Sequence, residues 1–283
     1  MIAVGPADAR YPARLLDLRQ PPDPLWIDGD LGALRGRAVS IVGTRRMTPY
    51  GARVARELAA ACAGAGILVI SGLAQGVDSA AHAGALEAGG KTIAVIGAGV
   101  NAYLAEIRGR RRNLAHAIRA KGALVSEFPP DAPAQKWTFA RRDATIAALG
   151  EVTVVVEAPE GSGALITAAE ARRLRRVVYA VPGPIGAAAS VGTNALIASG
   201  QARALTGAAG LVSAVGVIPP EGAKEGGDEV EGRVLDALAA SPADPDALAR
   251  HLGLRPDRLT EVLARLVIRG QVAAAADGRL ARR

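Results

Sequence analysis

The chain has 283 residues, half of them hydrophobic, and its 34 Lys and Arg against 27 Asp and Glu give a formal net charge of +7. This length and apolar content exclude a wholly disordered chain and suit one larger and one smaller domain. The single cysteine, Cys62, excludes an internal disulfide framework, and no apolar run approaches the roughly 20 residues that span a bilayer. We therefore expect a cytoplasmic protein with no membrane segment.

Short apolar runs ending in Gly or Ser alternate with Ala-rich stretches from Ala38 onward. The runs predict strands at residues 38–42, 67–70, 92–96, 123–126, 152–157 and 177–181. Because they are apolar on both faces, they are typical of a parallel sheet covered by helices. The stretches between them predict helices at 48–64, 78–88, 113–121 and 163–174, the first with Thr48 as its N-cap.

Repeated strand–helix–strand units predict an α/β fold with a doubly wound, mostly parallel sheet. We place this domain at residues 38–215, after an N-terminal segment at 1–37. The composition changes to Pro, Gly, Glu and Lys at 216–228, which predicts a flexible linker. Residues 229–283 then predict three short helices and a hairpin around Asp277-Gly278, the pattern of a small winged-helix domain.

The excess positive charge is concentrated in one segment. Residues 229–283 are almost balanced, whereas basic residues clearly outnumber acidic ones between residues 101 and 143. The basic residues of that segment are Arg108, Arg110, Arg111, Arg112, Arg119, Lys121, Lys136, Arg141 and Arg142. This excess favours a polyanionic partner, although solvated surface arginines would give the same composition.

The Gly-rich turns fall at the carboxyl ends of the predicted strands, where ligands gather in doubly wound sheets. Gly43, Gly72, Gly76 and Gly163 would let backbone N–H groups at helix N-termini point outward and hold phosphate oxygens. Arg45 would add a bidentate phosphate clamp. Several such turns along one edge suit a string of phosphates better than a single nucleotide.

The run KWTFARR at residues 136–142 interleaves cations with aromatics. Its cations would contact phosphates while Phe139 or Trp137 stacks on a base, which is typical of single-strand binding. The alternative that both aromatics pack in the core beside Phe128 stays open.

Motifs for catalysis, cofactors and metals are weak or missing. The Gly97–Gly99 turn resembles a dinucleotide fingerprint but lacks an acidic residue about 20 positions later, and there is no phosphate-binding Gly-Lys-Ser/Thr loop. Asp78 and His82 lie four residues apart and could pair or bind a metal. We favour Asp78 as a helix N-cap and His82 as a packed side chain. We therefore expect no catalytic residue, no cofactor and no metal.

Several motifs occur together in one order: VGTR at 42–45, SGLAQGVDSAAHAGAL at 71–86, SEFPP at 126–130, SGALITA at 162–168 and GTNALI at 192–197. In this order they resemble the DNA-processing protein A (DprA/Smf) family over about residues 11–205. The resemblance implies an extended Rossmann-like domain that binds single-stranded DNA, dimerises, protects incoming DNA during natural transformation and helps to load a RecA-type recombinase. A C-terminal winged helix is common in the family.

Motif position and charge together give the candidate DNA-binding residues Gly43, Arg45, Ser71, Gly72, Gln75, Lys136, Phe139, Arg141, Arg142, Ser162, Gly163 and Thr167. The chain departs from the family pattern after Phe139, where Arg-Asn-Arg is usual and residues 141–144 are Arg-Arg-Asp-Ala. It departs again at Tyr103-Leu104, where Tyr-Pro is usual and the basic insert 108–112 follows.

Two other functions stay open. The same turns would serve a nucleotide-binding Rossmann enzyme that acts on a small phosphate ligand. A transcription regulator would instead use the winged helix, with Arg255, Arg258, Arg265 and Arg269 at the groove, although that domain is almost neutral.

Overall fold

The structure is a computed structural model that describes residues 1–216, 228–268, 270–274 and 279–282. The chain divides into two compact units, Met1–Ile218 and Pro219–Arg283. Most of the predicted linker at 216–228 lies outside the described residues.

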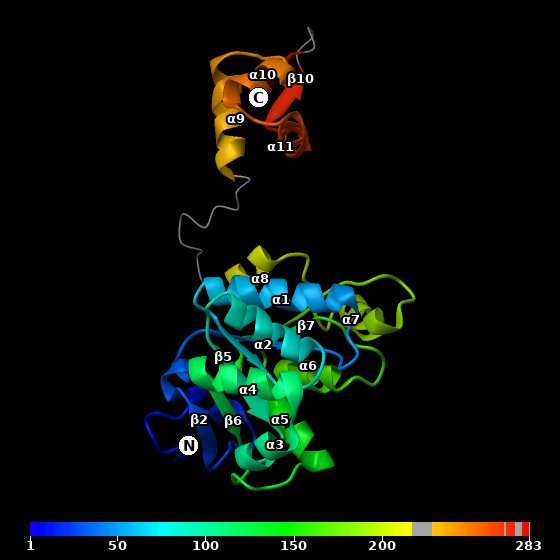
Figure 1. Cartoon of the computed structure of the whole chain (residues 1–283). Coiled ribbons are helices and arrows are strands. Elements are labelled where there is room, and N and C mark those ends of the chain that lie inside the picture. The colour runs from blue at the N-terminus through cyan, green and yellow to red at the C-terminus, as the bar shows by residue number, and fades with distance from the viewer. Residues whose placement is uncertain (217–227, 269, 275–278, 283) are drawn as a thin grey trace. The chain divides into compact units, whose positions relative to one another are not determined.

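The first unit is built on a nine-stranded sheet with the order β1-β2-β6-β5-β4-β3-β7-β8-β9 (Figure 1). Its strands are β1 (Ile2–Val4), β2 (Leu25–Gly29), β3 (Ala38–Val42), β4 (Leu68–Ser71), β5 (Thr92–Ile96), β6 (Ala123–Ser126), β7 (Val152–Val155), β8 (Val177–Ala180) and β9 (Arg203–Ala204). The strands β3 to β9 all run parallel to one another. Strand β2 pairs antiparallel with β6, and β1 pairs antiparallel with β2. The mostly parallel, Rossmann-like sheet that the sequence predicted is confirmed.

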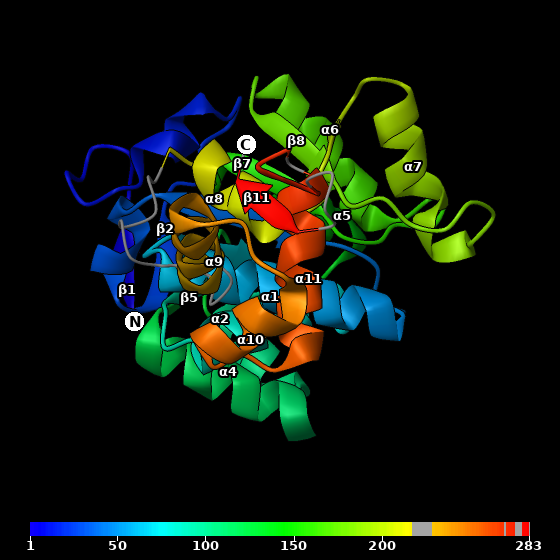
Figure 2. The same ribbon diagram turned by 90° about the horizontal axis from the view of Figure 1, so that it is seen from above.

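Residues 1–37 complete one edge of this sheet. Strand β2 pairs antiparallel with β6, with Ile27 opposite Val125, and β1 pairs with β2. Figure 2 shows these strands at one end of the unit and α7 at the other. The sequence did not predict either strand.

Helices cover both faces of the sheet. The α-helices are α1 (Pro49–Gly64), α2 (Val77–Glu87), α3 (Val100–Glu106), α4 (Gly109–Lys121), α5 (Lys136–Leu149), α6 (Gly163–Arg173), α7 (Val191–Ala198) and α8 (Ala208–Ala214), and the 3₁₀ helices are η1 (Ala13–Asp17), η2 (Leu31–Arg35) and η3 (Ala188–Ser190). Helices α1, α2 and α4 pack against one face of the sheet, and α5 and α6 pack against the other. The core therefore consists of two apolar layers with the sheet between them.

Helix starts differ from the predictions in three places. Thr48 caps α1 as predicted, because its hydroxyl accepts a hydrogen bond from the Gly51 amide at 3.1 Å. The predicted cap of α2 is wrong: Gly76, with φ of 88°, is the N-cap, and Asp78 lies inside the first turn. Helix α4 begins at Gly109, four residues before the predicted start, and α5 was not predicted as a helix.

The order of the strands reverses between β3 and β7. From β3 the chain builds β4, β5 and β6 outward on one side, then returns through α5 to place β7 on the other side of β3. Such a topological switch point leaves a crevice at the carboxyl ends of the two strands. Any ligand of this sheet is expected there.

The second unit is a small three-helix domain with a two-stranded sheet. It consists of α9 (Asp228–Ala240), α10 (Pro245–Leu252), α11 (Pro256–Ile268), β10 (Val272–Ala274) and β11 (Leu280–Arg282). Asp244 caps α10 through the Asp246 amide at 2.9 Å, and Gly253, with φ of 65°, ends it. This is the predicted winged helix, although the predicted turn at 277–278 lies outside the described residues. None of the helices described in either unit has the length and apolarity needed to cross a bilayer.

Candidate nucleic-acid interface

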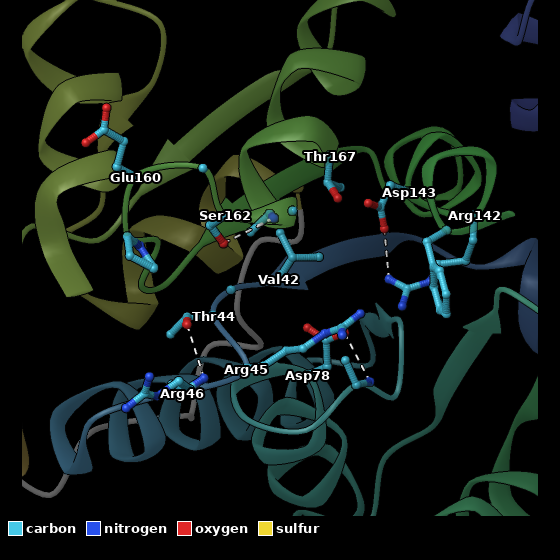
Figure 3. Close-up of a pocket in the computed structure, with 17 residues that line it drawn as sticks. Val42, Thr44, Arg45, Arg46, Asp78, Arg142, Asp143, Glu160, Ser162 and Thr167 are labelled. Atoms are coloured by element: carbon cyan, nitrogen blue, oxygen red, sulfur yellow. Dashed lines mark hydrogen bonds and ion pairs between the residues drawn. The ribbon is translucent and has the colours of Figure 1, made fainter. Parts of the chain in front are cut away.

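A pocket of about 320 Å³ lies at the topological switch point (Figure 3). Its walls are the loop after β3, the loop after β7 and one side of α5. We call it the switch-point pocket. Its lining residues are Val42, Gly43, Thr44, Arg45, Arg46, Ala74, Asp78, Phe139, Arg142, Asp143, Pro159, Glu160, Gly161, Ser162, Gly163, Ala164 and Thr167.

The pocket brings together about half of the candidate DNA-binding residues. Those that line it are Gly43, Arg45, Phe139, Arg142, Ser162, Gly163 and Thr167. Those outside its lining are Ser71, Gly72, Gln75, Lys136 and Arg141. The sequence missed the lining residues Thr44, Arg46, Asp78 and Glu160, of which Arg46 was visible as a second cation directly after the strand.

An exposed aromatic ring between two cations forms one wall. Phe139 is 37% exposed, and its ring centroid lies 5.7 Å from the Arg45 guanidinium carbon and 6.0 Å from that of Arg142. Phe139 therefore does not pack in the core, as the alternative would require. An accessible ring beside cations is a platform on which a base can stack while a phosphate meets a guanidinium.

Arg142 differs from the free cation that the sequence suggested. It is only 7% exposed, and its guanidinium donates to the Asp143 carboxylate at 2.8 Å. Asp78, also buried, lies near the same guanidinium: a Cβ added at Gly72 would overlap both the Arg142 guanidinium and the Asp78 carboxylate. Gly72 thus permits the loop after β4 to approach this cluster, and the charge of Arg142 is balanced by carboxylates.

Burial controls the ionisation of these carboxylates. Loss of solvent raises the pKa of Asp143 to about 6; the neighbouring Asp78 also raises it, while Arg142 opposes the shift. Burial likewise raises the pKa of Asp78, again opposed by Arg142. Near neutral pH the Asp143 carboxylate is ionised and offsets a cation at the pocket wall, and mild acid removes that negative charge.

Arg141 and Lys136 lie on different sides of α5. The Arg141 guanidinium donates two hydrogen bonds to the buried Glu127 carboxylate, at 2.9 and 3.0 Å, so the expected phosphate contact is replaced by an internal ion pair. Lys136 is exposed in the first turn of α5. Trp137 is 55% exposed and its ring meets Phe128 edge-on at 5.5 Å, so it packs against the core without entering it.

The Gly-rich loops are packed together more closely than predicted. The Thr44 amide donates to the Glu157 carbonyl at 2.7 Å, and the Val77 amide donates to the Thr44 carbonyl at 3.2 Å. These two amides are therefore not open phosphate donors. Ser71 is fully buried and its hydroxyl donates to the Ile41 carbonyl at 2.6 Å, whereas Gln75 is exposed beside the pocket loop.

The start of α6 remains open toward the pocket. Ser162 is its N-cap and accepts a hydrogen bond from the Ala164 amide, Gly163 is exposed, and Thr167 lies buried one turn later. The positive end of the helix dipole therefore faces the pocket and favours an anion there. Glu160, exposed in the same loop, is the opposing charge.

Asp78 and His82 do not form a metal pair. The buried His82 ring bonds through Nδ1 to the Thr92 hydroxyl at 2.6 Å, and burial lowers its pKa to about 3. His82 is thus a neutral core side chain, as favoured. Across residues 1–216 and the described parts of the second unit, no group of three or more His, Cys, Asp and Glu side chains is arranged to hold a metal ion.

The Gly97–Gly99 turn is structural. The Gly99 amide donates to the Ala132 carbonyl at 2.8 Å, and a Cβ at Gly97 would press against the Phe139 ring. This turn therefore packs against α5 and its aromatic ring.

Arg265, in helix α11 of the winged helix, is paired with two carboxylates of the same domain. Arg265 donates to Glu231 at 2.8 Å and to Glu261 at 2.7 Å. The side chain of Arg258 and the whole of Arg269 lie outside the described residues. The charge of Arg265, which the regulator hypothesis placed at the groove, is therefore offset by two carboxylates of the same domain.

Comparison with known proteins adds to this geometry. Residues 3–216 match the family model described as DNA recombination-mediator protein A, and residues 218–278 match one described as the DprA winged helix domain. Protein Smf of Escherichia coli K12 is 41% identical over 196 residues, which are 69% of this chain and 52% of that protein. The chain therefore spans about half the length of this curated relative.

Two solved structures are also similar. The X-ray structure of DNA processing protein A from Streptococcus pneumoniae has a TM-score of 0.69 at 33% identity, covering 75% of this chain and 73% of that one. DNA processing protein A from Helicobacter pylori, whose structure describes a single-stranded DNA binding mode, has a TM-score of 0.65 at 28% identity, covering 72% and 91% of the two chains.

Proposed function

This chain belongs to the DNA recombination-mediator protein A family, and from this premise we propose that it binds single-stranded DNA at the switch-point pocket. The observation that carries the proposal is the exposed Phe139 ring within 6.0 Å of the Arg45 and Arg142 guanidinium carbons. The single-strand binding of the similar Helicobacter pylori protein supports it.

The side chains divide the work of binding. A base stacks on Phe139, which contributes about 1–3 kcal/mol for each stacked base without preference for one base. Arg45, exposed at the pocket mouth, holds a phosphate with its planar fork, and the start of α6 holds another. Lys136 adds positive charge at the first turn of α5, beside the path of the DNA. Arg142 mainly fixes the pocket wall through its ion pair with Asp143.

Binding in this form requires no chemical step. We propose that the protein is not an enzyme and needs no cofactor: it covers the bases and phosphates of incoming DNA, as a homodimer, and presents the strand to a RecA-type recombinase. The family description as a recombination mediator supports this role. A loading assay tests it: the protein should speed filament formation by the recombinase on single strands coated with single-strand binding protein, and no acceleration would refute the mediator role.

The central experiment is a competition between an oligonucleotide single strand, its duplex and a mononucleotide across a salt series. Single strands should bind most tightly, with an affinity that falls steeply with salt. Arg45→Ala with Lys136→Ala should weaken binding, whereas Lys121→Ala with Arg203→Ala, which removes equal charge at exposed positions outside the pocket, should not. Unchanged binding in the first variant would refute the assigned site.

The pocket volume also suits the alternative of a nucleotide-binding enzyme, which the same experiment tests. A volume of about 320 Å³ falls at the lower end of small-ligand sites. If a mononucleotide competes as well as the single strand, the nucleotide-binding enzyme becomes the better interpretation.

A further inference from the structure

A cluster of arginines at the start of α4 has no part in the switch-point pocket. Arg108, Arg110, Arg111 and Arg112 are exposed, and we call them the arginine cluster. Arg108 donates to the Ile107 carbonyl at 2.9 Å, and no ion pair among the described residues involves the other three. The first turn of α4 contains no acidic residue.

This arrangement opposes the stability of the helix. Cations are unfavourable at a helix N-terminus, where the dipole is already positive, and adjacent like charges repel. The other end of α4 carries Arg119 and Lys121, where cations are favourable. The charges at the start of α4 therefore gain most from an anion supplied from outside the protein.

The arginine cluster lies at the same edge of the sheet as the pocket. Helix α4 leads from the carboxyl end of β5, through α3, back to the start of β6, so its first residues lie at the carboxyl edge. Tyr103 lies between the two regions: its hydroxyl donates to the Leu73 carbonyl at 3.0 Å, and burial raises its pKa to about 12 while Arg111 and Arg142 both oppose that shift. Helix α3, which separates the cluster from β5, is only about 10 Å long at 1.5 Å per residue.

The path from the pocket to the cluster runs past Phe139. The turn after β5 packs against this ring at Gly97 and leads directly into α3. From this turn the chain passes through α3 to the arginine cluster at the start of α4. Guanidinium forks bind phosphates, and the cluster itself contains no aromatic side chain for stacking.

We infer that the arginine cluster binds phosphates of the same DNA strand after it leaves Phe139, so that the DNA footprint extends past the pocket to α4. This inference rests on the proposed function. Residues 108–112 would then bind phosphates of any base sequence, and they would add to the affinity only for DNA long enough to reach them.

The test compares two variants with equal loss of charge. Arg110→Gln with Arg111→Gln alters the cluster, and Lys121→Gln with Arg203→Gln removes equal charge at two exposed positions, at the other end of α4 and in β9; glutamine keeps the helix propensity in α4. Oligo(dT) of about four and about 20 nucleotides brackets the site sizes of single-strand binding proteins. Each lost phosphate contact lowers the salt slope by about 0.7, which is about fivefold in affinity at roughly 0.1 M salt.

The cluster variant should bind the long oligonucleotide about 5- to 25-fold more weakly than the unaltered protein, with a salt slope lower by about 0.7–1.4. Its affinity for the short oligonucleotide should be unchanged. Its thermal midpoint should be unchanged or higher, because cations are removed from the start of a helix. Equal losses for both lengths, an equal loss in the control variant, or no loss at all would overturn the inference.

Failure of the proposed function gives a different result. If the unaltered protein binds neither oligonucleotide, or if Arg45→Ala changes nothing, the proposed site itself is wrong. If the site holds but the cluster variant loses affinity only for a duplex, the cluster binds duplex DNA and the inference falls alone.

Discussion

Replacing Asp143 with asparagine tests how the pocket controls its charge. The Asp143 carboxylate accepts a hydrogen bond from Arg142 at 2.8 Å and has a pKa of about 6 because of burial. At about pH 7.5 it is almost wholly ionised and offsets a cation beside the proposed phosphate path. Asparagine keeps an oxygen that accepts from Arg142 and removes the negative charge, so Asp143→Asn should bind single-stranded DNA more tightly.

The size of this effect follows from counting charges. One phosphate contact on a single strand changes affinity about fivefold at roughly 0.1 M salt, or about 1 kcal/mol. Coulomb's law for unit charges about 6 Å apart gives about 0.7 kcal/mol in water and about 2.8 kcal/mol at an effective dielectric constant of 20, which brackets this value. The unaltered protein should therefore gain about fivefold in affinity between about pH 7.5 and pH 5, where Asp143 becomes protonated.

The assay is a fluorescence anisotropy titration of oligo(dT), whose bases and phosphodiesters do not ionise over this range. Asp143→Asn should bind about fivefold more tightly at the higher pH and show little pH dependence. Glu87→Gln removes an exposed carboxylate at the far end of α2 and should behave like the unaltered protein. If the affinity of the unaltered protein is independent of pH, or if Asp143→Asn keeps the same pH dependence, the reasoning about a compensated Arg142 is refuted.

Two further substitutions and one acid-denaturation experiment test separate parts of the account. Phe139→Ala should weaken oligo(dT) binding by about 1–3 kcal/mol with an unchanged salt slope, since stacking releases no counterions; a reduced slope in the titration would count against stacking. Gly72→Ala should lower the thermal midpoint and weaken binding together, because its Cβ would displace Arg142; calorimetry showing an unchanged midpoint would contradict this packing. His82 has a folded pKa of about 3 against 6.5 unfolded, so its contribution to stability falls by about 1.4 kcal/mol per pH unit as pH drops below about 6.5. The raised pKa of Asp143 acts in the opposite direction between about pH 6 and 4, so acid denaturation should be steeper in Asp143→Asn, and identical curves would oppose both assignments.

The sheet was predictable where burial is symmetrical. Strands at 38–42, 92–96 and 123–126 match the predicted bounds because both of their faces are buried, which gives short runs of mostly apolar residues with only Ser or Thr among them. The edge strand β1 was missed because it has only three residues, and β2 was missed because its pairing with β6 depends on a contact about 100 residues away.

Helix α5 was missed because its first turn reads as a charged and aromatic run after prolines. At its start the Gln135 amide donates to the Thr138 hydroxyl at 3.1 Å and the Thr138 amide donates to the Gln135 carbonyl at 3.1 Å, a less common arrangement than a Ser or Thr cap followed by Glu. Because the segment is helical, Arg141 faces Glu127 and Arg142 faces Asp143. The order of these cations in the sequence does not show these partners.

The grouping of candidate residues around the pocket was therefore predicted in outline, whereas their ion pairs were not. Arg45 and Phe139 meet at the pocket as the motifs suggested. The pairing of Arg141 with Glu127 and of Arg142 with Asp143 depends on which carboxylates the fold buries nearby. The glycines signalled close packing of loops as much as phosphate binding, and sequence alone does not separate those two uses.

Photo-crosslinking of oligo(dT), followed by mass spectrometry of the attached peptides, tests the central claim most directly. The account predicts that crosslinks concentrate on Phe139 and Trp137 in the first turns of α5, with weaker attachment near Arg45. Crosslinks confined to the winged helix, or to the amino ends of the strands, would contradict it.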